Sequence, residues 1–171
     1  MQNEGHRRKP VASMKLLTQT LLDDLATKAA AATRGRAHHN IHADATDPVQ
    51  RFFVAADRRT YIRPHRHLQR GELGVALRGS FDLLTFTDDG TLSARQPFGP
   101  QLPAFAYEAE LLAWHTLVAR EDGSVFLEVK QGPYDPATAA EFAAWAPPEG
   151  DAAVPAMLRW LVEARVGERF R

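Results

Sequence analysis

The sequence predicts a mainly β fold: a small β-barrel or jelly roll formed by a single domain, with one helix before it and one after it. Three observations support this prediction. Short runs of strand-forming residues follow one another closely between residues 49 and 130, with turn residues between them. Apolar residues at helical spacing occur near both ends of the chain. The length of 171 residues suits one compact domain.

The strand-like runs are short and are separated by recognisable turns. Asp88-Asp89-Gly90 and Glu121-Asp122-Gly123 are typical of hairpin connections. Prolines recur between residues 97 and 103, and proline cannot donate to a strand ladder, so a loop is expected there. The expected strands cover residues 49–55, 59–67, 72–78, 81–87, 91–95, 108–113, 115–120 and 124–130.

The two ends of the chain have helical patterns. The first helix is expected from about Thr18 to a point before Gly35, with Leu21, Leu22, Leu25 and Ala29 at helical spacing. The second is expected from Pro155 to Phe170, because proline is well placed near a helix start. Residues 1–13 are expected to form a disordered tail before a domain that spans residues 14–171, and Met14 is an alternative native start.

Composition and charge exclude several classes of function. The 21 basic and 21 acidic residues balance, so nothing indicates a nucleic acid or an anionic membrane as partner. The chain has no cysteine, which removes disulfides, thiolate metal ligands and thiol catalysis. It has no apolar run near the roughly 20 residues that cross a bilayer, and its first dozen residues are too polar for a signal peptide. We therefore expect a cytoplasmic protein.

Three histidines and one glutamate predict a metal site. His65 and His67 are separated by one residue, so they share one face of a strand. Glu72 has the wrong parity for the same straight strand, but a turn at Gly71 can place it on a neighbouring antiparallel strand. His115 would close the site from a third strand. This nitrogen and oxygen set suits one divalent first-row metal, with iron, manganese, zinc and nickel left open.

The spacing of His65, His67, Glu72 and Gly79 resembles the first conserved motif of the cupins. The glycine that often opens that motif is replaced by Arg59, and the Pro-x-Gly turn that usually precedes the last histidine is missing before His115. Further segments are similar to the WbuC-type cupin-fold metalloproteins: residues 34–42, 47–50, 60–67, 114–116, 128–136 and 142–147. The resemblance implies a cupin-type barrel, a bound metal, and an association with surface-polysaccharide biosynthesis. Cupins also commonly pair, so a homodimer is expected.

Strand alternation extends the site beyond its four ligands. Tyr61 and Arg63 share a face with the histidines if residues 59–67 form a regular strand. Gly74 and Ala76 lie on the Glu72 face and would leave room above the metal, whereas Leu73, Val75 and Leu77 form an apolar row on the other face. We expect Lys130, Glu128 and Tyr61 as catalytic residues that move protons or orient the substrate, and Arg63, Tyr61 and Tyr134 as substrate-binding residues.

The leading hypothesis is a metal-dependent enzyme that acts on a small polar substrate such as a sugar or sugar derivative. That the substrate is a sugar is implied only by the family resemblance. Isomerisation, epimerisation, oxygenation and hydrolysis stay open as reactions. One alternative is a non-catalytic sugar-binding or regulatory module in which the metal anchors the ligand. Another is a metal with a purely structural role, which would make the fold dependent on metal.

Overall fold

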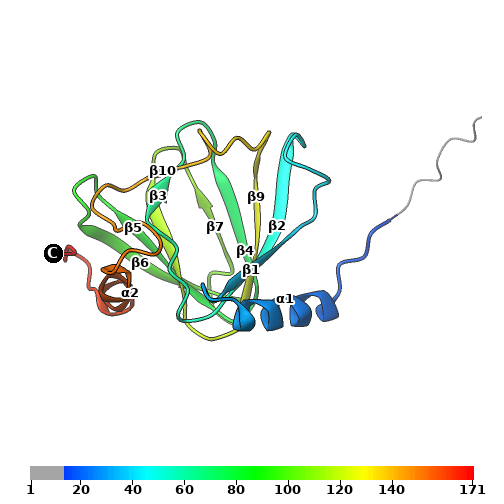
Figure 1. Cartoon of the computed structure of the whole chain (residues 1–171), viewed down its shortest axis with the longest axis horizontal. Coiled ribbons are helices and arrows are strands. Elements are labelled where there is room, and N and C mark those ends of the chain that lie inside the picture. Colours follow the sequence, from blue (N-terminus) through cyan, green and yellow to red (C-terminus); the bar gives the residue numbers. More distant parts are fainter. Residues whose placement is uncertain (1–13) are drawn as a thin grey trace, which may run out of the picture.

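The computed structural model describes residues 14–171, and the predicted tail at residues 1–13 lies outside the described residues. Two five-stranded antiparallel sheets face each other, with a helix at either end of the chain (Figure 1). The elements are α1 (Gln19–Ala31), β1 (Arg36–Asn40), β2 (Val49–Ala56), β3 (His65–Arg66), β4 (Glu72–Arg78), β5 (Phe81–Phe86), β6 (Leu92–Phe98), β7 (Ala106–Ala109), β8 (Trp114–Ala119), β9 (Ser124–Gln131), β10 (Glu141–Phe142) and α2 (Val154–Glu163). The prediction of a mainly β jelly roll with two flanking helices is confirmed.

Each sheet has one face toward the other sheet and one face toward a helix. The first sheet has the order β1-β2-β9-β4-β7 and the second the order β10-β3-β8-β5-β6. The core between them includes Phe81, Phe98 and Phe126. Alternation along the strands explains the two faces, because residues two apart point the same way.

The helices cover the outer faces. Leu22 and Leu25 of α1 pack with Phe53 of β2, while Met157 and Leu161 of α2 pack in a separate cluster on the second sheet. The Thr18 side chain caps α1 by accepting a hydrogen bond from the Leu21 N–H at 3.4 Å. Among residues 14–171, none of the helices has the length and apolar character that a membrane span requires.

The predicted strand at residues 59–67 is wrong, since only His65–Arg66 pairs as a strand. Pro64 has no N–H to donate to a ladder. The Thr60 hydroxyl instead donates to the Gly35 carbonyl at 2.6 Å, and Arg59 donates to the Ala30 carbonyl near the end of α1 at 2.5 Å. Side-chain hydrogen bonds thus hold this segment where strand pairing was expected.

Other boundaries also differ from the prediction. Pro97 lies inside β6, which is an edge strand and therefore tolerates a missing donor. The second helix ends at Glu163 instead of Phe170, because the backbone after it pairs with the start of β6: the Leu92 N–H donates to the Glu168 carbonyl at 2.8 Å. Strands β1 and β10 were not predicted, and β7 covers Ala106–Ala109 instead of residues 108–113.

Candidate metal centre

Three strands from two sheets bring the four predicted ligands together. His65 lies on β3 directly opposite His115 of β8, in the second sheet. His67 follows β3, and Glu72 opens β4 in the first sheet. The sequence analysis placed Glu72 on a strand beside the histidines, which is wrong, because β4 pairs with β7 and β9 and faces β3 from the opposite sheet. The turn at residues 68–71 therefore crosses between the sheets, and the site is enclosed from both sides.

The four ligand atoms form a tight and buried group. One nitrogen from each histidine and one oxygen of Glu72 all lie within 4.8 Å of one another. His67, Glu72 and His115 are buried, while His65 is half-buried. The Glu72 carboxylate lies 2.8 Å from His67 Nε2 and 3.2 Å from His115 Nε2. This donor set could hold a divalent transition metal ion.

In each of the three histidines of the site, the Nδ1 atom contacts a backbone carbonyl. His65 Nδ1 lies 2.9 Å from the Arg63 oxygen, His67 Nδ1 lies 2.6 Å from the Ala139 oxygen, and His115 Nδ1 lies 2.8 Å from the Ala113 oxygen. A carbonyl can only accept, so each Nδ1 carries the proton. The neutral tautomer then has its free lone pair on Nε2, which is the arrangement that metal-binding histidines typically show.

The electrostatics show how tightly these groups interact. Burial lowers the pKa of the His65 imidazole to about 3, and the neighbouring His115 adds to this effect. Burial alone would raise the pKa of Glu72, but without metal His115 and His67 can donate to it from Nε2 as imidazolium ions, and these hydrogen bonds outweigh burial and hold the pKa well below its usual range. Burial likewise opposes ionisation of His115, yet the Glu72 carboxylate raises its pKa. Glu72 is therefore an anion that needs positive charge beside it.

Tyr107 is a contact of the site that the sequence analysis missed. It lies on β7 opposite Gly74, and its hydroxyl donates to Glu72 Oε1 at 2.8 Å. A Cβ at Gly74 would lie 2.1 Å from the Tyr107 ring, so the glycine makes space for the tyrosine. Gly74 and Ala76 do share the Glu72 face, but the room above Gly74 is filled by this ring. The alternation of β4 could have indicated a large partner opposite the glycine, though not which one.

Glu128 and Lys130 of β9 lie beside the cluster as a buried ion pair. Lys130 Nζ is 2.5 Å from Glu128 Oε1, and Lys130 is paired across the strands with Glu72. Glu128, His65, Glu72, Tyr107 and His115 are among the residues that enclose a cavity of about 40 Å³. Burial and the charge of Glu72 raise the pKa of Glu128 to about 7, although Lys130 opposes this shift. A carboxyl group of this kind can accept or release a proton near neutral pH.

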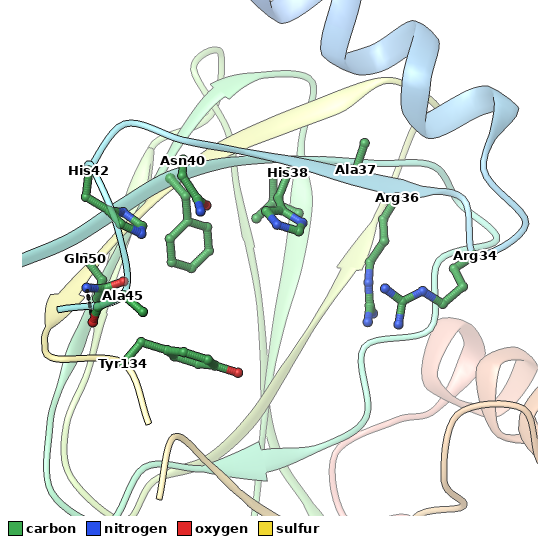
Figure 2. Close-up of a pocket in the computed structure, with 11 residues that line it drawn as sticks. Arg34, Arg36, Ala37, His38, Asn40, His42, Ala45, Gln50 and Tyr134 are labelled. Carbon is green, nitrogen blue, oxygen red and sulfur yellow. Dashed lines mark hydrogen bonds between the residues drawn. The ribbon is translucent and has the colours of Figure 1, made fainter. Parts of the chain in front are cut away.

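Tyr61, Arg63 and Tyr134 lie away from this cavity. The Tyr61 side chain packs in the cluster beneath α2, and its hydroxyl donates to the Pro147 carbonyl at 2.9 Å. The Arg63 guanidinium donates to the carbonyls of Ala146 and Ala143 at 3.0 and 2.9 Å. The expectation that Tyr61 and Arg63 share a face with the histidines relied on a regular strand at residues 59–67, which does not form. Tyr134 lines a different pocket (Figure 2).

Several solved structures are similar in fold to this chain. The chain resembles a protein from Shewanella oneidensis at 13% identity, covering 80% of this chain and 90% of that chain with a TM-score of 0.52. It resembles CapF bound to 3-isopropenyl-tropolone at 12% identity, covering 62% and 34% with a TM-score of 0.50. A cupin 2 domain-containing protein from Halorhodospira halophila gives 14% identity, 78% and 85% coverage and a TM-score of 0.47. At these identities the likeness concerns the fold alone.

The two facing sheets with their flanking helices form a mainly β jelly roll, and the buried histidine–glutamate group gives it a possible metal site. Residues 17–98, less than half of the chain, match a family described as a domain of unknown function, DUF6016. No curated protein matches the chain in sequence.

Proposed function

We propose that this chain is a metal-dependent cupin enzyme that acts on a small polar substrate, a sugar or sugar derivative in surface-polysaccharide metabolism. One observation supports the proposed metal site. The Nδ1 atoms of three histidines are all held by backbone carbonyls, so their Nε2 atoms are available to bind a metal beside the buried Glu72. The proposal that the substrate is a sugar is based on the sequence resemblance to the WbuC-type cupins.

His65, His67, Glu72 and His115 would hold the metal, and a bound metal would supply Lewis-acid polarisation of a carbonyl or hydroxyl oxygen of the substrate. The chain's own residues would handle the proton. Glu128 borders the same cavity as Glu72, so it is the group best placed to take a proton from the substrate or return one. Lys130 is bonded to Glu128 and would steady the negative charge on the Glu128 carboxylate after it gives up a proton.

The enzyme proposal is tested with a panel of sugars and sugar phosphates, following product formation by NMR. The protein is purified anaerobically without added metal, and its metal content is measured first. Lys130→Ala is expected to lose about 100-fold or more in turnover while retaining its metal. Lys28→Ala, on the surface of α1, is the matched control and should keep full turnover. Turnover by Lys130→Ala at the wild-type rate would remove this residue from the mechanism.

Ionisation of Glu128 should be visible in the pH dependence of stability of the metal-free protein. Because burial raises the pKa of Glu128 from 4.5 to about 7, the folded state binds its proton more tightly than the unfolded state does. The contribution of Glu128 to the free energy of unfolding is therefore fully present below pH 4.5 and is lost as pH rises toward 7. Urea unfolding between pH 4.5 and 7 should show a decline for the wild type that is smaller in Glu128→Gln. Equal slopes would contradict a shifted pKa.

The small cavity favours the two non-catalytic alternatives, a metal that anchors a ligand and a metal that supports the fold. Its volume of about 40 Å³ is close to that of one or two water molecules, so the site as described has room for a small oxygen ligand only. A metal that merely anchors a ligand or supports the fold would suit such a space. Cobalt substitution separates these roles: if small oxygen ligands change its visible spectrum, the metal has an open position. If they leave it unchanged, and chelation unfolds the protein, the structural role is favoured.

We also propose that the protein forms a homodimer through the outer face of the first sheet. Leu73 and Leu77 on β4 are 41% and 36% exposed, and Val75 and Val129 lie beside them outside the cover of α1. Such an apolar row fits a second copy of the same surface. Leu73→Glu is expected to convert dimer to monomer in sedimentation velocity, whereas Leu111→Glu, in the turn after β7, should not. A monomeric wild type would refute the dimer.

A further inference from the structure

A second cavity, at β1 and β2, is separate from the metal centre. It has a volume of about 360 Å³, against about 40 Å³ for the cavity beside His65, Glu72 and His115. Its walls come from the segment entering β1, from β1 and β2, and from the loop that carries Tyr134 (Figure 2). This volume lies in the range of pockets that enclose small molecules.

The pocket and Glu72 of the metal centre lie on the same face of the first sheet. Gln50 in the pocket wall is paired with Lys130, which is paired in turn with Glu72. Phe52 is likewise paired with Glu128, and Lys130 Nζ lies over the Phe52 ring at 5.2 Å from its centroid. Two strand spacings, roughly 10 Å, therefore separate the pocket wall from Glu72. The ion pair on β9 stands between them.

One end of the pocket is positively charged. Arg34 and Arg36 contribute guanidinium groups to its wall, and no carboxylate belongs to the described lining. Both arginines reach the carboxylate of Glu149: Arg34 Nη1 lies 2.6 Å from Oε2, and Arg36 Nη2 donates to Oε1. Two positive charges thus share one negative charge, so the group retains a net positive charge. A guanidinium pair of this kind recognises carboxylate or phosphate oxygens through its planar donors.

The middle of the pocket is apolar and partly aromatic. Phe52 and Val54 form its floor on β2, and Tyr134 stands across from β1 with its hydroxyl directed toward the side where Arg34 and Arg36 lie (Figure 2). Tyr134 is 46% exposed, so its ring is available for contact with a ligand. A flat ligand body between these aromatic side chains would bury apolar surface on both faces.

We propose that this pocket binds a small anionic ligand, a carboxylate or phosphate ester with a flat ring, and that it does so without the metal. The anionic group lies at Arg34 and Arg36, and the ring lies between Phe52 and Tyr134. Glu149 is an internal competitor, since it occupies donors of both arginines. The site does not depend on the proposed enzyme activity, because the four metal ligands and Lys130 are not among the residues that line it.

Calorimetric titration of the metal-free protein with phenyl phosphate and benzoate tests the proposal. Saturable binding is expected for at least one probe, about tenfold tighter than for inorganic phosphate because the ring adds apolar contact. Benzoate and phenyl phosphate distinguish a carboxylate site from a phosphate site. No saturable binding of either probe to the wild type would overturn the proposal.

Variants locate the binding site. Arg34→Ala and Tyr134→Ala should each weaken binding by about tenfold. Arg58→Ala is the matched control, because Arg58 and Arg34 side chains are 67% and 63% exposed and each has one ion-pair partner among the described residues. Glu149→Gln should tighten binding, since it frees both arginines. Arg36 is left intact because it also donates to the Tyr61 carbonyl.

The metal centre is a second location at which an anion could bind. His67→Ala should leave the affinity for phenyl phosphate unchanged if the pocket is the site. A loss in His67→Ala that equals the loss in Arg34→Ala, or weaker binding in Glu149→Gln, would refute the assignment. Metal-free protein is used throughout so that an anion bound to a metal cannot imitate the result.

Discussion

Replacing His67 by alanine is expected to reduce the affinity for a divalent transition metal by more than about 100-fold, because partners outside the ligand set alone are worth 10–100-fold. His67 is buried and meets Glu72 at 2.8 Å, and its Nδ1 is fixed by the Ala139 carbonyl. The substitution removes one ligand and leaves a buried carboxylate short of a partner. Metal content after anaerobic purification, and competition with a chelator, measure the effect.

The matched control for this experiment is His38→Ala. His38 is an exposed histidine of β1 outside the metal group, so its removal should leave the metal content unchanged. Thermal unfolding of both variants without metal checks that any loss is not simply unfolding. With metal at 1,000 times its dissociation constant, the wild type should gain about 4 kcal/mol in stability. His67→Ala should gain almost none, and an equal gain in the two proteins would contradict the assigned site.

The second large effect is expected for Gly74→Ala, although this adds only one methyl group. The new Cβ would lie 2.1 Å from Tyr107 Cε1 and 2.5 Å from Cζ, so the buried ring must move. Overpacking of this kind costs about 1–3 kcal/mol. Movement of the ring also breaks the hydrogen bond to Glu72, and we expect metal affinity to fall by about tenfold. Denaturant unfolding of the metal-free protein and metal competition measure the two effects separately.

A double-mutant comparison shows whether Tyr107 carries this effect. In a Tyr107→Ala background the ring is gone, and Gly74→Ala should then cost little further stability. Tyr107→Phe keeps the ring but removes the hydroxyl, so it should lower metal affinity with a smaller loss of stability. Additive costs for Gly74→Ala and Tyr107→Ala would show that the glycine is required for another reason.

The strand pattern was the most predictable part of the fold. The expected strand at residues 72–78 matches β4, and the strand at 49–55 matches β2 to within one residue. In these runs polar and apolar residues alternate or most residues are apolar, and tertiary contacts reinforce the preference for a strand. The strand prediction for residues 59–64 was wrong. Pro64 has no N–H to donate to a strand ladder, and the side-chain hydrogen bonds of Thr60 and Arg59 hold this segment instead. Propensity gives no sign of such long-range partners.

The ligands of the candidate metal centre were predictable, but their surroundings were not. His65, His67 and Glu72 lie close together in the sequence, so their spacing can be recognised as a motif. Tyr107 and Glu128 reach the site through pairing with β4, which depends on the register of distant strands. Tyr61 and Arg63 were misplaced for the converse reason: their expected position assumed a strand that tertiary contacts prevent.

Residue types and spacing were enough to recognise most strands, both helices, the lack of thiols and the three histidines that meet Glu72. They did not show that Glu72 approaches from the opposite sheet, that Tyr107 fills the space at Gly74, or that a pocket opens at Arg34 and Arg36. The physical reason is that alternation along a strand fixes which side chains share a face. Which faces meet depends on strand order and on packing between sheets, and these are properties of the whole chain.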